Sequence, residues 1–293
     1  MKKTFRFAGV VAISTILAIS ATSCSQGGGK ETNGEAKENV KAKEAEKVDV
    51  KDIFFYTPRH RAEKYQPTEE KLGFGKDILY IADSEFEGNT NIKEIWFAPK
   101  LNHIVNKAFR NCTSLRQVHF QGPIAVINDN AFEGCKSLET LNVDAYTVGV
   151  EAFKGCTSLS SVRFGDNIWW IRVGAFEGCT NLKSILMAIT MKKLDDGAFV
   201  GCNALEEVSI PNDFKNRMFG MLETCTKLKK VYLLSTEYYE MPKNCNRSAS
   251  CTLYVPDAFL AKFKADPEWS KFGSIEPLSK SAHYTGEGFW KKK

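Results

Sequence analysis

Apolar residues recur at fixed offsets along most of the chain, with polar residues between them. The stretch AFEGCKSLETL, which begins at Ala131, shows the pattern. Four related stretches share its apolar positions and begin at Ala108, Ala152, Ala175 and Ala198. Each ends in an alternation of apolar and polar residues that is typical of a β-strand with one buried face. In the copy from Ala152, we expect Leu159, Val162 and Phe164 to point inward.

One cysteine in each copy marks the period. The six cysteines are Cys112, Cys135, Cys156, Cys179, Cys202 and Cys225. Consecutive ones are 23, 21, 23, 23 and 23 residues apart. A weaker copy begins at Phe86, with Asn89 in the cysteine position, and a Gly before most cysteines suits a tight turn with positive φ. This period, with Leu, Ile or Val at fixed offsets, predicts a β-rich α/β solenoid of about seven leucine-rich repeats.

Segments outside the repeats are expected to cover the two open ends of the solenoid. Residues 51–77, which begin with the apolar run from Ile53 to Tyr56, form the expected N-terminal cap. The pattern fades after residue 233, and residues 252–278 form the expected C-terminal cap. There we expect a last strand at Thr252–Pro256, and then a helix with Asp257 as its N-cap.

The apolar face of that cap helix would close the solenoid core. It carries Phe259 and Phe263, and Trp269 follows Pro267, which is expected to end the helix or to start it again. The whole repeat domain with its caps is predicted to span residues 51–278. Residues 279–293 are expected to form a polar tail.

The first 50 residues predict export and anchoring. Residues 1–23 combine a basic start, an apolar run from Ala8 to Ala21 and small residues before Cys24, as in a signal peptide. An ordinary cleaved signal would explain the run. The sequence Ala-Thr-Ser-Cys resembles a bacterial lipobox, which implies a lipid on Cys24. Residues 24–50 lack aromatic side chains and are predicted to form a disordered tether.

The repeated AF-x-GC-x-SL-x-x-V pattern and the ending LYVPDAFLAKFKADPEWSKF resemble the BspA-type leucine-rich-repeat proteins of bacterial surfaces. The resemblance covers roughly residues 78–278. It implies a solenoid with a parallel concave sheet and a non-enzymatic role in adhesion or ligand capture, with host matrix proteins among the ligands of the family.

Metal, disulfide, catalytic and nucleic-acid roles find little support in the residues. The cysteines lie one per repeat and lack the paired spacing of a zinc site, so we expect free, buried thiols and no metal or cofactor. Cys245 and Cys251 stand outside this series and could pair with each other in an exported protein. The four histidines are scattered, so no enzyme is expected. The formal charge of +5 is small, and three of the lysines stand at the C-terminus, so we expect no nucleic-acid partner.

Two surfaces are candidates for ligand binding. The outward column of the predicted concave sheet has an aromatic residue near each end, Trp96 and Tyr232. A second surface follows each strand, where two adjacent columns gather aromatic and basic residues. Its candidates are Tyr146, Trp169, Trp170, Lys192, Lys193, Tyr238 and Tyr239, and Lys215 falls in the same register. Because Ile168 and Ile171 take inward positions, Trp169 and Trp170 cannot both be buried by alternation. Packing of one Trp on its neighbours is the alternative interpretation.

The sequence therefore predicts a non-catalytic protein that binds a ligand at the bacterial surface, anchored by lipid in the outer membrane. A flat sheet suits adhesion to a protein, such as a host matrix or other surface protein. The aromatic columns would also suit an oligosaccharide, so glycan capture for nutrient uptake stays open.

Overall fold

The computed structural model describes residues 54–56, 66–211, 225–240 and 250–283. All of them belong to the unit Val48–Lys293. The expected signal peptide, Cys24 and the tether lie outside the described residues. None of the helices in the described part has the length or the apolar run that crossing a bilayer would need.

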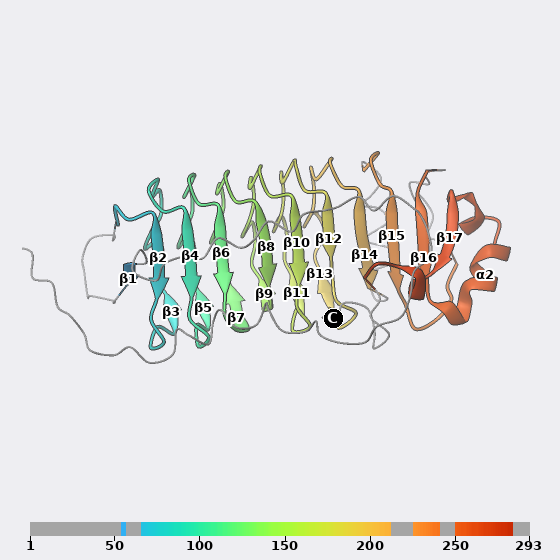
Figure 1. Ribbon diagram of the computed structural model, residues 1–293, viewed down its shortest axis with the longest axis horizontal. Helices are drawn as coiled ribbons and strands as arrows, with labels where there is room; N and C mark the ends of the chain where they lie inside the picture. The colour runs from blue at the N-terminus through green and yellow to red at the C-terminus, as the bar shows by residue number, and fades with distance from the viewer. Residues whose placement is uncertain (1–53, 57–65, 212–224, 241–249, 284–293) are drawn as a thin grey trace, which may run out of the picture. The chain divides into compact units, whose positions relative to one another are not determined.

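The domain is a coil of parallel strands, with about eight turns (Figure 1). This confirms the predicted leucine-rich-repeat solenoid. The strands that face the viewer in Figure 1 form the main sheet, in two hydrogen-bonded segments. The first segment contains β1 (Phe54–Tyr56), β2 (Lys71–Phe74), β4 (Glu94–Phe97) and β6 (Gln117–Phe120). The second contains β8 (Thr140–Val143), β10 (Ser161–Phe164), β12 (Ser184–Leu186), β14 (Glu207–Pro211), β15 (Lys230–Leu234), β16 (Thr252–Val255) and β17 (Ser274–Pro277).

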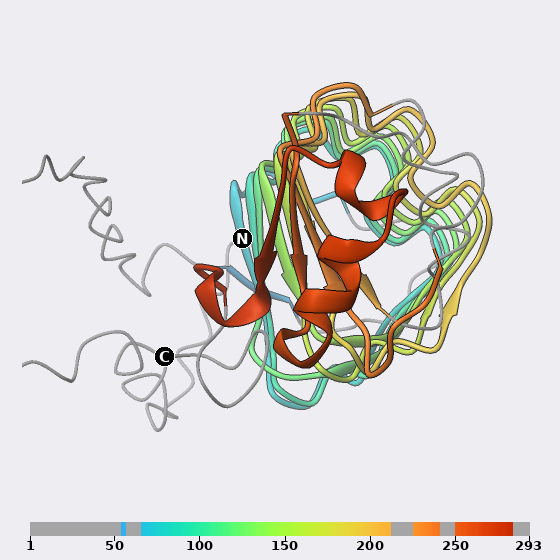
Figure 2. The same cartoon turned by 90° about the vertical axis from the view of Figure 1, so that its right-hand side faces the viewer.

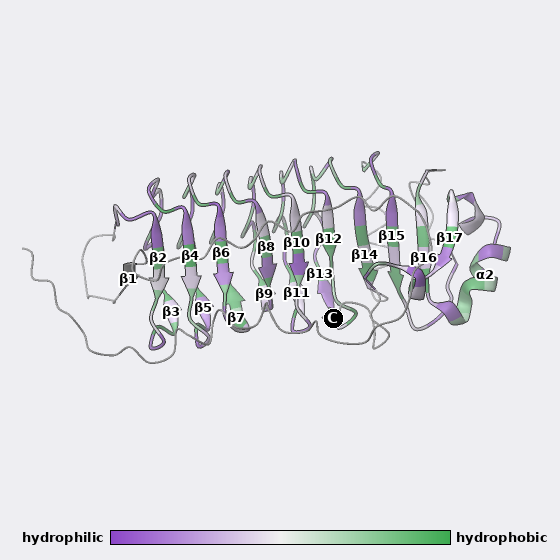
Figure 3. Ribbon diagram, viewed as in Figure 1, coloured by the Kyte–Doolittle hydropathy of each residue, from purple (hydrophilic) through white to green (hydrophobic). Residues whose placement is uncertain are grey.

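Shorter strands form a second sheet along one edge of the coil. It contains β3 (Tyr80–Ile81), β5 (His103–Ile104), β7 (Ile124–Ile127), β9 (Ala145–Val148), β11 (Trp170–Ile171) and β13 (Lys193–Leu194). Viewed along the coil, the strands of successive turns lie behind one another (Figure 2). Most strands of the main sheet carry both hydrophobic and hydrophilic residues, because one side faces the core and the other faces outward, whereas β7 is hydrophobic throughout (Figure 3).

A ladder of phenylalanine rings fills the core. Neighbouring rings from Phe86 to Phe199 stack nearly parallel, with centroids 5.0–5.4 Å apart. The members are Phe86, Phe109, Phe132, Phe153, Phe176 and Phe199. The backbone N–H of each of the first five donates to the carbonyl of the Ala in the next turn, for example from Phe153 to Ala175 at 2.8 Å. Each turn therefore needs its neighbours to complete its core and its hydrogen bonds.

The cysteines form a second buried ladder beside the rings. Each thiol from Cys112 to Cys202 donates to the carbonyl of the Phe in the preceding turn, for example Cys179 Sγ to Phe153 O at 3.3 Å. The described cysteines carry free thiols, Cys251 among them; Cys245 lies outside the described residues. In the first copy, Asn89 replaces the thiol and donates to Pro67 O at 2.9 Å. The predicted buried ladder is confirmed, and the thiols also bond one turn to the next.

The turns on the side away from the main sheet need backbone with positive φ. The position before Cys takes φ of 70° at Gly155 and 72° at Gly178, and Asn111 fills it with φ of 58°. Glycine reaches this region without the steric cost that a side chain brings. The prediction of a tight turn with positive φ where Gly precedes the cysteine is therefore confirmed for Cys135, Cys156, Cys179 and Cys202.

Charged side chains alternate in sign along the position that follows each Phe. The column reads Glu87, Arg110, Glu133, Lys154, Glu177 and Val200. Arg110 Nε lies 3.2 Å from Glu87 and 3.8 Å from Glu133, and Lys154 Nζ lies 3.3 Å from Glu177. We call this column the charge ladder.

The ends of the solenoid differ from the expectation in several details. The expected N-terminal cap, residues 51–77, contains β1 and β2, and β2 pairs with β4 in the main sheet. At the other end the expected last strand is followed by another, because β17 pairs with β16. The helix α2 (Leu260–Ala265) covers this end in Figure 2. Its Phe263 is buried, as predicted, and so is Trp269.

Asp257 does not cap the helix as expected. It begins a 3-10 turn, η4 (Asp257–Phe259), and its carboxylate accepts hydrogen bonds from the backbone N–H and the hydroxyl of Ser279. A further turn, η5 (Trp269–Lys271), precedes β17, and η6 (Leu278–Lys280) follows it. Residues 279–283 are therefore folded, which differs from the polar tail expected from residue 279.

Candidate functional site

The outer side of the second sheet aligns its residues in two columns. Trp170 pairs in register with Thr147 of β9 and with Lys193 of β13. The backbone N–H of Trp169 donates to Tyr146 O, which places these two residues side by side in the other column. The alignment expected from the sequence is therefore confirmed for these strands. We call the surface formed by both columns the edge surface.

Both tryptophans lie outside the core. Ile168 and Ile171 are fully buried, and the two residues between them form the corner where the chain enters the second sheet. Trp169 is 38% exposed and Trp170 is half-buried. The strand β11 is only two residues long, so strict alternation does not constrain both side chains.

The ring of Tyr146 stacks on Trp169. Their centroids are 5.5 Å apart, the planes differ by 3°, and Tyr146 is 50% exposed. Trp169 meets Trp170 edge to face at 6.4 Å. The rings therefore support one another along the solenoid axis, and the pair of Tyr146 and Trp169 presents its edges to the outside.

Two cations hold Trp170. Lys193 Nζ lies 3.6 Å from the ring centroid, and Arg172 Cζ lies 5.1 Å from it. Arg172 also donates to Asp129 Oδ1 at 3.0 Å. These contacts are cation–π interactions. Trp170 therefore holds Lys193 in position at the end of the edge surface where the basic residues lie. Lys192 and Lys193 are both exposed there.

Sequence reasoning missed the other end of the edge surface. Tyr80 of β3 and the preceding Leu79 are 64% and 54% exposed, and Tyr80 pairs in register with His103. Both lie near the expected border of the cap, where the cysteine marker is absent. The signal that could have found them is Ile81, which stands at the same offset as Ile104 and Ile127.

Tyr238 and Tyr239 do not extend the edge surface, because they pack into the C-terminal cap. Tyr239 is buried and meets Trp269 edge to face at 5.7 Å. The hydroxyl of Tyr238 donates to Asp266 Oδ2, and this hydrogen bond raises the pKa of Tyr238 to about 12. Their expected role in ligand contact needs correction, since the cap covers the positions that the repeat would leave outside. Lys215 lies outside the described residues.

On the main sheet, Trp96 stacks on His119, with centroids 4.9 Å apart and planes 15° from parallel. Trp96 is half-buried, and burial lowers the pKa of His119. This end of the outward column therefore keeps an aromatic pair, as a ligand surface would require.

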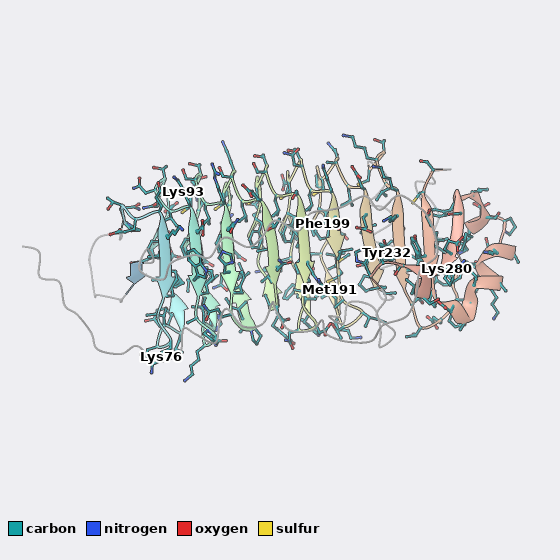
Figure 4. All side chains as sticks on the ribbon, in the orientation of Figure 1. Lys76, Lys93, Met191, Phe199, Tyr232 and Lys280 are labelled. Carbon is teal, nitrogen blue, oxygen red and sulfur yellow. The ribbon has the colours of Figure 1, made fainter. Side chains whose placement is uncertain are left out.

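The expectation for Tyr232 at the other end is wrong, because the segment after β17 covers it. Tyr232 is 1% exposed and packs with Leu278 and Leu234. Figure 1 shows this segment crossing the face of the last strands, and Figure 4 labels Tyr232 and Lys280 in this region. We call residues 278–283 the strap.

The strap is fastened to β14 by a network around Glu207. His283 Nε2 lies 3.0 Å from Glu207 Oε1, and the Tyr232 hydroxyl donates to the same oxygen. Burial favours the protonated acid, but the hydrogen bonds from His283 and Tyr232 outweigh it and lower the pKa of Glu207 to about 2. The carboxylate is therefore a charged anchor for the strap at neutral pH.

The described residues hold no converged catalytic set. Burial raises the pKa of Cys112, Cys156 and Cys202 to about 12, so these thiols are protonated and poor nucleophiles. Within the same residues, no group of three or more His, Cys, Asp or Glu side chains is placed to hold a metal ion.

Parallel strands at a spacing of about 23 residues, with a buried Phe and Cys in each turn, define a leucine-rich-repeat solenoid. Residues 68–139 and 140–251 match, in six copies, the family described as the BspA type Leucine rich repeat region. The match spans more than half of the sequence, and the chain belongs to this family. No curated protein matches it in sequence.

Several solved structures are similar to the chain. A leucine rich cell surface protein from Faecalibacterium prausnitzii A2-165 is 18% identical with a TM-score of 0.45, and the match covers 78% of this chain and 70% of that one. The T. pallidum leucine rich repeat protein is 18% identical with a TM-score of 0.42, over 75% of this chain and 85% of its own. A leucine-rich repeat protein from Bacteroides ovatus ATCC 8483 is 19% identical with a TM-score of 0.39, over 79% and 70%.

Proposed function

We propose that this chain is a non-catalytic binding protein of the bacterial surface, whose edge surface contacts a protein ligand. The observation that carries the proposal is the exposed, stacked pair of Tyr146 and Trp169 on a rigid sheet. Large aromatic side chains held in one rotamer provide contact area with little loss of entropy on binding. The family of the chain supports a binding role over a catalytic one.

The packing of the rings favours a protein over a sugar. A sugar binds an aromatic side chain by laying its apolar face on the face of the ring. Tyr146 and Trp169 each lose one ring face to the other, and Trp170 is held by Lys193 and Arg172, so less ring face is left for a sugar than on separate rings. The edges that stay outside suit contact with the varied side chains of a protein surface.

The test is a double variant, Tyr146→Ala with Trp169→Ala, probed on a panel of purified extracellular matrix proteins and on a glycan array. The matched control is Val200→Ala, which removes exposed apolar area from the charge ladder and leaves the edge surface intact. We expect the wild type and the control to bind a matrix protein, and the double variant to lose at least about tenfold in affinity. Binding confined to the glycan array would replace the proposal by glycan capture. Unchanged protein binding by the double variant would move the site to another surface.

Anchoring through a lipid on Cys24 is part of the same proposal. Its support is the apolar run followed by Ala-Thr-Ser-Cys. A Cys24→Ala variant should leave the membrane fraction or accumulate as an unprocessed precursor. A processed variant that still partitions with detergent would show that the anchor is elsewhere.

A further inference from the structure

The edge surface changes character along the solenoid axis. Beside Tyr146 on the N-terminal side lies Ala125, and beyond it lies the exposed Asn102. On the other side, Trp169 is followed by Lys192. The column therefore runs from a small apolar position, across two stacked rings, to a basic end. A ligand that matches it must be apolar at one end and acidic at the other.

We propose that the edge surface binds an extended peptide segment of its partner, with an apolar side chain beside Tyr146 and an acidic side chain at Lys192 and Lys193. The inference rests on the proposed function, because it names the chemistry of the protein ligand at the same site. It adds a direction and a spacing to that ligand.

The apolar end is a slot one strand wide. Neighbouring strands are about 4.8 Å apart, so the positions of Tyr146 and Asn102 are separated by about 9.6 Å. The thickness of the two side chains leaves room between them for one aliphatic side chain or one proline ring. Ala125 provides the floor, since its methyl group is too short to fill the space. One face of Tyr146 is covered by Trp169, and the opposite face looks along the axis toward this slot.

The acidic end of the ligand is chosen by charge. Lys192 and Lys193 are adjacent and exposed, and the contact with Trp170 fixes Lys193 Nζ in place. Arg172 adds a third positive charge nearby, although Asp129 balances it at 3.0 Å. Asp195 and Asp196 follow the lysines on the chain and would repel a carboxylate that passed beyond them. A carboxylate is therefore best placed directly at the two lysines.

The distance between the two ends sets the sequence spacing of the ligand. From Ala125 to Lys192 there are three strand steps, about 14 Å. An extended peptide rises about 3.3 Å per residue, so the two side chains should stand about four residues apart. The peptide would lie across the strands. It would not add to a sheet edge, because β9 and β11 are paired on both sides.

The experiment uses an array of ten-residue Gly/Ser peptides that carry one Leu and one Glu. The spaced peptide has them four positions apart, a second has them adjacent, and a third replaces Glu by Lys at the wider spacing. The purified full chain is tested beside three variants. Lys192→Glu with Lys193→Glu reverses the basic end, Ala125→Trp fills the slot, and Lys262→Glu with Lys264→Glu makes the same charge change on the exposed side of α2. Thermal unfolding first establishes that each variant is folded.

We expect the wild type to bind the spaced Leu/Glu peptide at least about tenfold more than the other two. The Lys192/Lys193 variant should prefer the peptide with Lys, while the Lys262/Lys264 variant keeps the wild-type order. The Ala125→Trp variant should lose its dependence on Leu and keep its preference for Glu.

Three outcomes overturn the inference: no binding to any peptide, equal binding to Glu and Lys peptides, or equal effects of the two charge variants. The proposed function is judged separately, by whether Tyr146→Ala with Trp169→Ala abolishes binding to a matrix protein. If the double variant loses binding to a matrix protein but no peptide binds the wild type, the edge surface remains the binding site. In that case only the proposed chemistry of the ligand is wrong.

Discussion

The inside of the solenoid and its edge surface follow opposite rules. Inside, the same residue returns in turn after turn, and the Phe rings repeat their stacking at 5.0–5.4 Å. Along one column of the edge surface, every described strand carries a different residue, in the order Tyr80, His103, Val126, Thr147, Trp170 and Lys193. The repeat thus dictates a residue only where two neighbouring turns enclose it. Positions that no turn encloses are free to differ and to recognise a ligand.

The largest effect should come from opening the Phe ladder at its centre. Phe153 is fully buried between Phe132 and Phe176. Phe153→Ala removes both stacking contacts and leaves a cavity, so we expect it to lower the free energy of unfolding by about 3–5 kcal/mol. Chemical denaturation followed by circular dichroism measures this. A loss below about 1 kcal/mol would mean that the turns adjust independently of the ladder.

A smaller loss is expected in the cysteine ladder. Cys179→Ser places a hydroxyl in an apolar site, and its shorter bond draws the donor away from Phe153 O, which the thiol reaches at 3.3 Å. A poorly bonded buried hydroxyl costs about 1–3 kcal/mol. The matched variant Cys179→Ala loses the same hydrogen bond and stays apolar, so it should be the more stable of the two. If Cys179→Ser and the wild type have the same free energy of unfolding, the hydrogen bond outweighs apolar burial at this position.

Glu207 points outward from the main sheet, but the strap covers it. Glu207 has a pKa of about 2 in the folded chain, below its ordinary value of 4.5. Its contribution to stability is therefore present above pH 4.5 and is lost as the pH falls toward 2. Glu207→Gln should cost about 1–2 kcal/mol at pH 7. The difference in the free energy of unfolding between the variant and the wild type should be smaller when it is measured at pH 3. A gap independent of pH would show that packing, and not charge, holds the strap.

The smallest effect on stability is expected at the edge surface itself. Trp169 is 38% exposed and stacks only along the surface. Trp169→Ala should therefore change the free energy of unfolding by less than about 1 kcal/mol. The same denaturation experiment gives the value. A loss comparable to that of Phe153→Ala would make Trp169 a packing residue and favour the main sheet as the binding site.

The repeated part of the fold could be predicted because each turn restates it. The cysteine spacing alone aligns Trp170 with Thr147 and Lys193, as the strand pairing confirms. The structure of the two ends could not be predicted from the repeat, because each contact there occurs only once. His283 and Glu207 are 76 residues apart in the chain, and no period links them. The burial of Tyr232 and Tyr239 follows from such single contacts, which is why both were expected outside.

The charge ladder limits how the solenoid can change in length. Neighbouring turns carry opposite charges from Glu87 to Glu177. Duplication or loss of a single repeat within this stretch would bring two like charges side by side, which is unfavourable by up to about 1 kcal/mol for partly exposed groups. Duplication of two adjacent repeats would preserve the alternation. A gene encoding this solenoid is therefore expected to lengthen or shorten most easily by pairs of turns, about 46 residues at a time.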